Sequence, residues 1–244
     1  YAMASYDDVS TWTCEDCTGG TVGTQFVTQY DDPIKGVHWY LAVHPSNRTI
    51  ILSFEGSNVQ SIVTFIQDIR FKQVAWPPSV DGSAVHNGFL DSMTAGAAQA
   101  MTALQQQIAK TPEYRISITG HSLGAAQAVL FVTYIATHQP TWLSRTTVYT
   151  YGQPRVGNAA FAVYYQGLGV PTTRVVNKND IVTRLAPRWT HYAQQGNEVW
   201  IRPSDGSVVA CAAVVPAENP NCSAGQSLTD LRVSDHLQYF SARS

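Results

Sequence analysis

The chain has 244 residues, of which 44% are hydrophobic and only 13% are charged. A net charge of −2 argues against a nucleic-acid-binding protein, and no apolar run reaches the roughly 18 residues that a transmembrane helix needs. A chain of this length and composition can bury a large core, so we expect residues 1–244 to form a single domain.

The first part of the chain carries strand signals followed by a long helix signal. Residues 1–6 are typical of the end of a short helix. Residues 22–30, 36–43 and 49–54 are expected to be strands, because they are rich in apolar and β-branched residues and are separated by turn-forming residues. Residues 87–109 are expected to form a helix, since apolar residues recur there at helical spacing.

Residues 58–69 come three residues after the third expected strand and have one apolar helical face opposite uncharged polar residues. That face consists of Val59, Ile62, Val63, Ile66 and Ile69, with Phe65 beside it. An ordinary amphipathic helix packed on the core would explain this pattern. The alternative is a mobile lid whose apolar face covers a site in water and meets lipid when it opens.

A Gly-x-Ser-x-Gly motif, formed by Gly120, Ser122 and Gly124, lies between an alternating strand pattern at 114–119 and an apolar helix pattern that follows. At such a strand-to-helix elbow the serine is held in a strained backbone conformation with its hydroxyl exposed to substrate, and glycines are needed where a Cβ would clash. The start of the helix offers unpaired N–H groups to a developing oxyanion. The motif and its context therefore predict Ser122 as a nucleophile.

Strand and helix signals alternate through the rest of the chain. Residues 146–151 and 173–176 are expected to be strands, and 159–165 a helix. Residues 189–214 indicate turns and short strands, and 235–240 a terminal helical turn. Strand–helix alternation of this kind predicts a largely parallel sheet with right-handed crossovers.

A nucleophilic serine needs a base, and the base needs an orienting carboxylate, in the chain order serine, acid, histidine. The possible bases are then His191 and His236. The acids between Ser122 and the last histidine are Asp180, Glu198, Asp205, Glu218, Asp230 and Asp235. Asp180 directly follows an expected core strand, whereas Asp205 lies in a turn and Asp235 is expected to cap the last helical turn. We therefore choose Asp180 and His236, and His191 remains the alternative base.

The chain has four cysteines, Cys14, Cys17, Cys211 and Cys222. They allow three pairings, of which 14–17 and 211–222 are expected because each joins near neighbours. A zinc site is disfavoured since the two pairs lie far apart in the sequence. Two glycosylation sequons, at Asn47 and Asn221, agree with passage through a secretory route, so we expect a secreted glycoprotein.

Taken together, the motifs resemble the secreted fungal class 3 lipases, a family that includes feruloyl esterases and mono- and diacylglycerol lipases. The matching stretches are residues 85–89, 120–125, 151–158, 179–182 and 236–240, in the family's order. The resemblance implies an α/β-hydrolase fold, with a central, mostly parallel sheet flanked by helices and a short amphipathic lid helix. It also implies that no cofactor or metal is required.

The resemblance implies that the serine, aspartate and histidine chosen above form a catalytic triad. It further implies that Ser57 and Leu123 form the oxyanion hole, and that Asp68 supports the Ser57 hydroxyl. Two positions depart from the common family pattern, since Glu55 stands where arginine is usual and Phe65 stands near a usual tryptophan. We expect the first departure to affect the anchoring of the lid and not the chemistry.

The resulting expectation is a secreted, monomeric serine ester hydrolase that acts on acylglycerols at an oil–water interface. It would work through an acyl-enzyme on Ser122, with a lid at about 58–68. A lid rich in Val, Ile and Phe and without a basic residue favours lipid. The alternatives are a feruloyl or aryl ester hydrolase of the same family and, in another class, a non-catalytic hydrolase-fold binding module.

Overall fold

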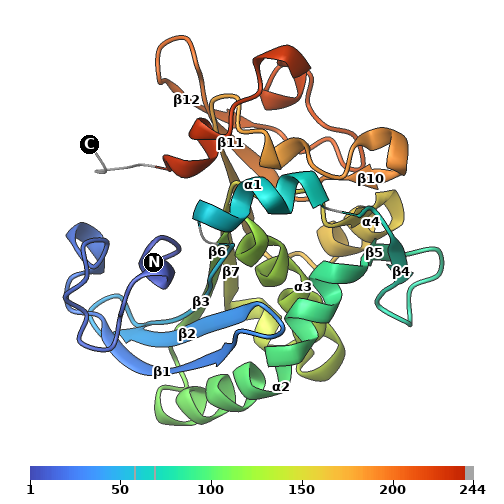
Figure 1. The fold of residues 1–244 in the computed structure, drawn as a ribbon. Helices are drawn as coiled ribbons and strands as arrows, with labels where there is room; N and C mark the ends of the chain where they lie inside the picture. Colours follow the sequence, from blue (N-terminus) through green and yellow to red (C-terminus); the bar gives the residue numbers. More distant parts are fainter. Residues whose placement is uncertain (58, 69, 240–244) are drawn as a thin grey trace.

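The computed structural model describes residues 1–57, 59–68 and 70–239. An eight-stranded sheet with the order β1-β2-β3-β6-β7-β9-β11-β12 runs through the molecule (Figure 1). Its strands are β1 (Gln25–Asp32), β2 (Val37–His44), β3 (Thr49–Phe54), β6 (Arg115–His121), β7 (Thr146–Tyr151), β9 (Thr172–Asn177), β11 (Asn197–Ile201) and β12 (Val208–Cys211). The strands from β3 to β11 are parallel, whereas β1, β2 and β12 add antiparallel edges. The expected, mostly parallel sheet is confirmed.

A second, four-stranded sheet with the order β10-β8-β5-β4 was not predicted. It consists of β4 (Gln73–Ala75), β5 (Ala84–His86), β8 (Gly157–Asn158) and β10 (Tyr192–Ala193). Strands of two or three residues are too short to show a period in the sequence, so only the tertiary pairing reveals them.

Two long helices pack against each other on one side of the main sheet. They are α2 (Asn87–Lys110), which contacts β1 and β2, and α3 (Leu123–His138), which contacts β3, β6 and β7. The shorter helix α4 (Ala159–Gly167) begins after Asn158, whose side chain accepts a hydrogen bond from the Phe161 N–H at 2.9 Å. This cap satisfies one of the N–H groups that a helix start leaves unpaired.

Alternate residues of β2 point to opposite faces of the sheet and build two cores. Trp39 and Leu41 join the large apolar cluster under α2 and α3. Tyr40 and Ala42 instead pack against the N-terminal segment, which includes Val9. The N-terminal segment therefore covers the face of the sheet that the long helices leave uncovered, and it brings the short 3-10 helix η1 (Ala4–Tyr6) to the sheet.

Both expected disulfides, 14–17 and 211–222, are present. The two sequon asparagines, Asn47 and Asn221, are exposed. Across the described ranges, no helix combines the length and apolar character that crossing a bilayer requires.

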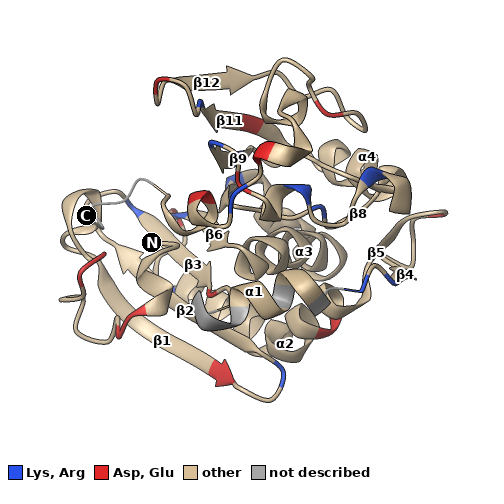
Figure 2. Ribbon diagram, turned by 45° about the horizontal axis from the view of Figure 1, so that its top comes forward, with Lys and Arg blue, Asp and Glu red and all other residues tan. Residues whose placement is uncertain are grey.

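Charged residues are sparse and scattered along the ribbon in the view of Figure 2. Some of them are buried as ion pairs. Arg155 Nε lies 2.6 Å from Glu218 Oε1, and Arg174 Nη2 lies 2.7 Å from Glu198 Oε2, with all four side chains less than 10% exposed. Burial is tolerated because each charge is paired and hydrogen-bonded.

Candidate active site

Ser122 occupies a sharp turn between β6 and α3, with φ 57° and ψ −124°. The two motif glycines allow this turn. A Cβ on Gly120 would overlap the backbone of Gly124, and a Cβ on Gly124 would overlap the backbone of Phe54. The strand, strained serine and helix that the motif predicted are therefore all present in the structure.

Asp180 and His236 are hydrogen-bonded to each other although they are 56 positions apart. His236 Nδ1 lies 2.9 Å from Asp180 Oδ2 and 3.0 Å from Oδ1, and both side chains are fully buried. Asp180 lies just after β9, and His236 lies in the 3-10 helix η8 (Ser234–Leu237). The Val182 N–H also donates to Asp180 Oδ1 at 2.8 Å. These bonds fix both the carboxylate and the plane of the imidazole.

Tyr239 is a further partner of this pair that sequence reasoning missed. Its hydroxyl donates to Asp180 Oδ2 and accepts a hydrogen bond from the Asn177 N–H at 3.1 Å. Burial first, and then the negative charge of Asp180, raise the pKa of Tyr239 well above its ordinary value, so the phenol stays protonated and donates. In the sequence, Tyr239 is recognisable only as a residue three positions after His236, and that position does not predict a contact with Asp180.

The imidazole of His236 lies next to the serine elbow. Its ring stacks on the ring of His121, the residue before Ser122, with centroids 4.4 Å apart. A Cβ on Gly152 would overlap the His236 ring and touch Asp180. Ser122 Oγ and His236 Nε2 are both buried, and neither has a hydrogen-bond partner among the described residues. The hydroxyl and the ring nitrogen that a triad needs are thus unengaged at the same end of the sheet.

His121 connects this site to the N-terminal segment. Burial, followed by the charge of His236, lowers the pKa of His121 to about 3, so its ring is neutral and has one donor and one acceptor nitrogen. Nε2 lies 2.9 Å from the His236 carbonyl oxygen, which can only accept, so Nε2 carries the hydrogen. The Tyr6 hydroxyl, 2.9 Å from Nδ1, must then donate.

The alternative base is exposed, and two of the other candidate acids accept hydrogen bonds elsewhere. His191 is exposed at the end of the 3-10 helix η5 (Arg188–Thr190). Asp205 accepts the Ser207 N–H in a turn, as expected. The expected helix cap by Asp235 is wrong. Its carboxylate instead accepts the Asn179 N–H at 3.1 Å, because the tertiary fold brings the loop after β9 within reach.

The residues expected to form the oxyanion hole flank Ser122. Leu123 is the first residue of α3, and Ser57 lies half-buried between β3 and α1 (Val59–Asp68). A Cβ on Gly56 would meet Ser122 Cβ at 3.0 Å, so residues 55–57 run against the nucleophile.

The helix expected at about 58–68 is present as α1, which lies across the end of the main sheet near β6 in Figure 1. Ile62 is buried and Ile66 half-buried, but Val63, expected on the same face, is 46% exposed. Consecutive residues of a helix point about 100° apart, so a narrow contact between α1 and the rest of the protein can bury Ile62 and leave Val63 exposed. The side chains of Val59, Phe65 and Asp68, and all of Ile69, lie outside the described residues.

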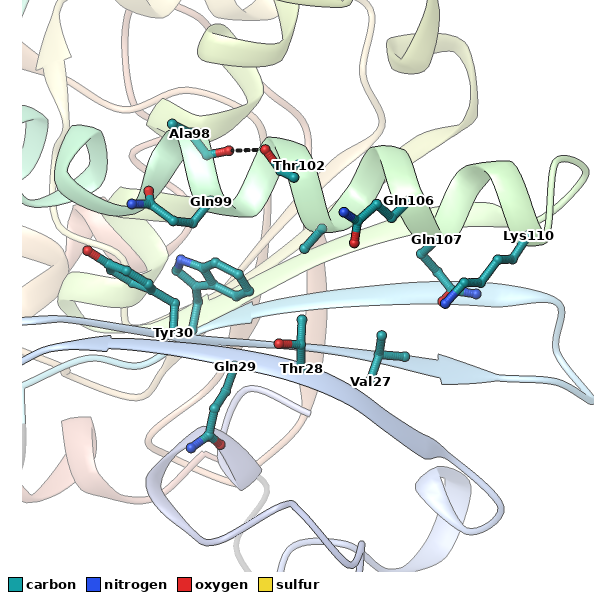
Figure 3. A pocket seen from close by; sticks show the side chains of 12 residues that line it. Val27, Thr28, Gln29, Tyr30, Ala98, Gln99, Thr102, Gln106, Gln107 and Lys110 are labelled. Carbon is teal, nitrogen blue, oxygen red and sulfur yellow. Dashed lines mark hydrogen bonds between the residues drawn. The ribbon is translucent and has the colours of Figure 1, made fainter.

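Two other features could be mistaken for functional sites. A groove of about 590 Å³ lies between β1 and α2 (Figure 3), and its lining, which includes Tyr30, Gln106 and Lys110, contains none of the expected site residues. Within the described part of the chain, a group of possible metal ligands is formed by Glu198 and the two cysteines of the 211–222 disulfide. Disulfide sulfurs are not thiolates, so this group is not a metal site.

The chain is similar to known lipases in both sequence and fold. Residues 51–189 match the profile of the family described as Lipase (class 3). The chain is 35% identical to a lipase of Rhizomucor miehei over 95% of its own length and 62% of that relative. It is 29% identical to the secreted mono- and diacylglycerol lipase A of Penicillium cyclopium, over 92% of this chain and 72% of the relative. The structure of lipase II from Rhizopus niveus superposes with a TM-score of 0.90 at 30% identity, covering 98% of this chain and 90% of that one.

The chain thus spans about three fifths of the Rhizomucor miehei relative. The family profile matches more than half of the chain, and the solved fold matches nearly all of it. This chain belongs to the class 3 lipase family.

Proposed function

We propose that the chain is a serine carboxylic ester hydrolase that acts on acylglycerols, and that residues 1–244 work as one domain. The observation that carries the proposal is the buried hydrogen bond between Asp180 and His236 beside the strained Ser122 elbow. Ser122, Asp180 and His236 would then be the catalytic triad. Membership of a family whose relatives are named lipases supports the choice of substrate class.

The proposed reaction begins when Ser122 Oγ attacks the ester carbonyl carbon. His236 Nε2 accepts the serine proton, since Nδ1 is engaged with Asp180. The tetrahedral intermediate then breaks the bond to the alcohol, and the alcohol leaves with that proton. The acyl group stays covalently bound to Ser122. A water molecule, deprotonated by the same imidazole, releases the carboxylic acid and restores the serine.

We propose that the oxyanion is bound by the Leu123 N–H and by Ser57, with Asp68 supporting the Ser57 hydroxyl. The position of Leu123 at the start of α3 supports this, because helix N-termini present unpaired N–H groups. Loss of one such donor typically raises the barrier by about 3 kcal/mol.

We propose that α1 is a lid that opens at a lipid–water surface, where the monomeric enzyme finds its substrate. Residues 58–68 contain no basic side chain, and the described part of α1 has a buried Ile62 and an exposed Val63. Secretion is supported by the two disulfides and by relatives that are named secreted lipases. The exposed sequons at Asn47 and Asn221 are proposed glycosylation sites.

The experiment compares hydrolysis of emulsified triglyceride and diglyceride with hydrolysis of methyl ferulate, by the wild type and by Ser122→Ala. We expect the glycerides to be preferred, with a rate increase above substrate solubility, and Ser122→Ala to be inactive while folded. Preference for the ferulate would replace the lipase assignment with a feruloyl esterase. A folded wild-type chain that hydrolyses none of the esters and does not react with a serine-directed phosphonate would be a binding module.

A further inference from the structure

An ion pair lies at the base of the loop that leads from β3 to the lid. His38, on β2, is hydrogen-bonded through Nδ1 to Glu55 Oε2, and the Glu55 N–H donates to the His38 carbonyl oxygen at 2.9 Å. The two side chains are only 19% and 25% exposed. A hydrogen bond between charged groups that are partly shielded from solvent keeps a more fixed geometry than a fully exposed ion pair does.

The surroundings of His38 favour its charged form. The hydrogen bond to Glu55 raises the pKa of His38 above its ordinary value, and burial opposes this rise. The charges of Glu55 and of Asp31, which faces His38 across the β1–β2 ladder, and the Ser5 carbonyl add to the increase. His38 therefore remains an imidazolium to higher pH than a free histidine.

The residue after Glu55 is in close contact with the nucleophile. A Cβ on Gly56 would overlap the Tyr6 hydroxyl and the His121 carbonyl oxygen, and would touch Ser122 Cβ. Because Gly56 has no side chain, its backbone lies directly against these atoms of Tyr6, His121 and Ser122. A displacement at Glu55 is therefore passed directly to the loop beside Ser122.

We propose that His38 and Glu55 form a positioning pair that fixes residues 55–57 against Ser122 and thereby sets the place of the Ser57 oxyanion donors. This inference rests on the proposed function of Ser57. The pair does not touch substrate, so its loss displaces the donors and does not remove them. The effect should be smaller than the roughly 100- to 1,000-fold loss of kcat that follows deletion of an oxyanion donor.

The raised pKa of His38 determines how the effect of the pair on turnover changes with pH. A group whose pKa is higher in the folded protein contributes fully at low pH, and its contribution is lost as pH rises through that folded value. The pair should therefore assist turnover at acid and neutral pH and lose its effect at alkaline pH.

The test measures kcat and KM for a soluble p-nitrophenyl ester across the titration range of histidine, about pH 5 to 9. His38→Ala should lower kcat about 5- to 10-fold at neutral pH with little change in KM, and the ratio of wild-type to variant kcat should fall towards one at alkaline pH. His38→Asn keeps an amide donor near the Nδ1 position but cannot titrate, so its deficit should be smaller and should also disappear at alkaline pH. His138→Asn, at the exposed end of α3, is the matched control and should keep the wild-type profile.

A ratio of wild-type to variant kcat that does not change with pH would overturn the proposal, since a merely structural role predicts a constant deficit. Equal kcat in all proteins would overturn it as well. If His38→Ala does not fold, as judged by circular dichroism, the His38→Asn profile decides by the same criterion. Failure of the proposed function is distinguishable, because Ser122→Ala would then retain turnover, whereas failure of the positioning pair leaves a wild type whose activity depends on Ser122.

Discussion

Replacing Ser122 should stabilise the fold while abolishing turnover. Its φ of 57° and ψ of −124° are close to the first central position of a type II′ turn, where glycine is preferred. Such strain costs on the order of 1–3 kcal/mol in a residue with a Cβ. Ser122 Oγ is also buried without a hydrogen-bond partner among the described residues, which costs a further 1–3 kcal/mol or so.

The two costs can be separated by two substitutions. Ser122→Ala removes the buried hydroxyl and keeps the strain, so it should raise the free energy of unfolding by about 1 kcal/mol. Ser122→Gly also removes the backbone strain, although glycine adds about 0.5–1 kcal/mol of chain entropy to the unfolded state. The free energy of unfolding of Ser122→Gly should therefore exceed that of Ser122→Ala by about 1 kcal/mol. For a domain of this size each kcal/mol raises Tm by about 2–4 °C.

Thermal unfolding of the three proteins, together with ester hydrolysis, provides the measurement. Ser5→Ala is the matched control, because the buried Ser5 hydroxyl donates to the Ala2 carbonyl oxygen at 2.7 Å and its removal should lower Tm. The reasoning would be refuted if Ser122→Ala lowered Tm as the control does, or if Ser122→Gly melted below Ser122→Ala.

Two further substitutions test the buried polar groups. Burial alone would raise the pKa of Glu218, but the hydrogen bonds and charge of Arg155 outweigh it and lower the pKa to about 2. Glu218→Gln should therefore lower the free energy of unfolding by about 3–5 kcal/mol at neutral pH. Its Tm deficit should shrink as pH falls from about 4.5 to about 2, because the wild-type carboxylate is then neutralised as well. A Tm deficit that does not depend on pH would contradict this. Tyr239→Phe removes a donor to Asp180 and an acceptor for the Asn177 N–H, so unfolding should become about 2 kcal/mol easier, measured as a Tm about 4–8 °C lower. Ester hydrolysis should persist within about tenfold, and an unchanged Tm would show that the phenol contributes nothing to the fold.

Much of the candidate site could be predicted from local patterns. The elbow followed from glycines at positions where a Cβ does not fit, and Asp180 from its place directly after an expected core strand. The strand at 146–151 was predicted with the bounds that it has in the structure. The disulfides were predictable because each joins residues near in sequence.

The sequence alone determined the longer helices and most strands of the main sheet, because hydrophobic periodicity and glycine positions act over a few residues and leave a local record. Only the tertiary structure decided the contacts that surround the triad, such as Tyr239 on Asp180, Tyr6 on His121, and His38 on Glu55. Tyr6 and His121 are 115 positions apart, and their hydrogen bond exists only because the N-terminal segment packs on the face of the sheet opposite the long helices. No local pattern records such a contact, since the energy that forms it comes from burying apolar surface elsewhere in the chain.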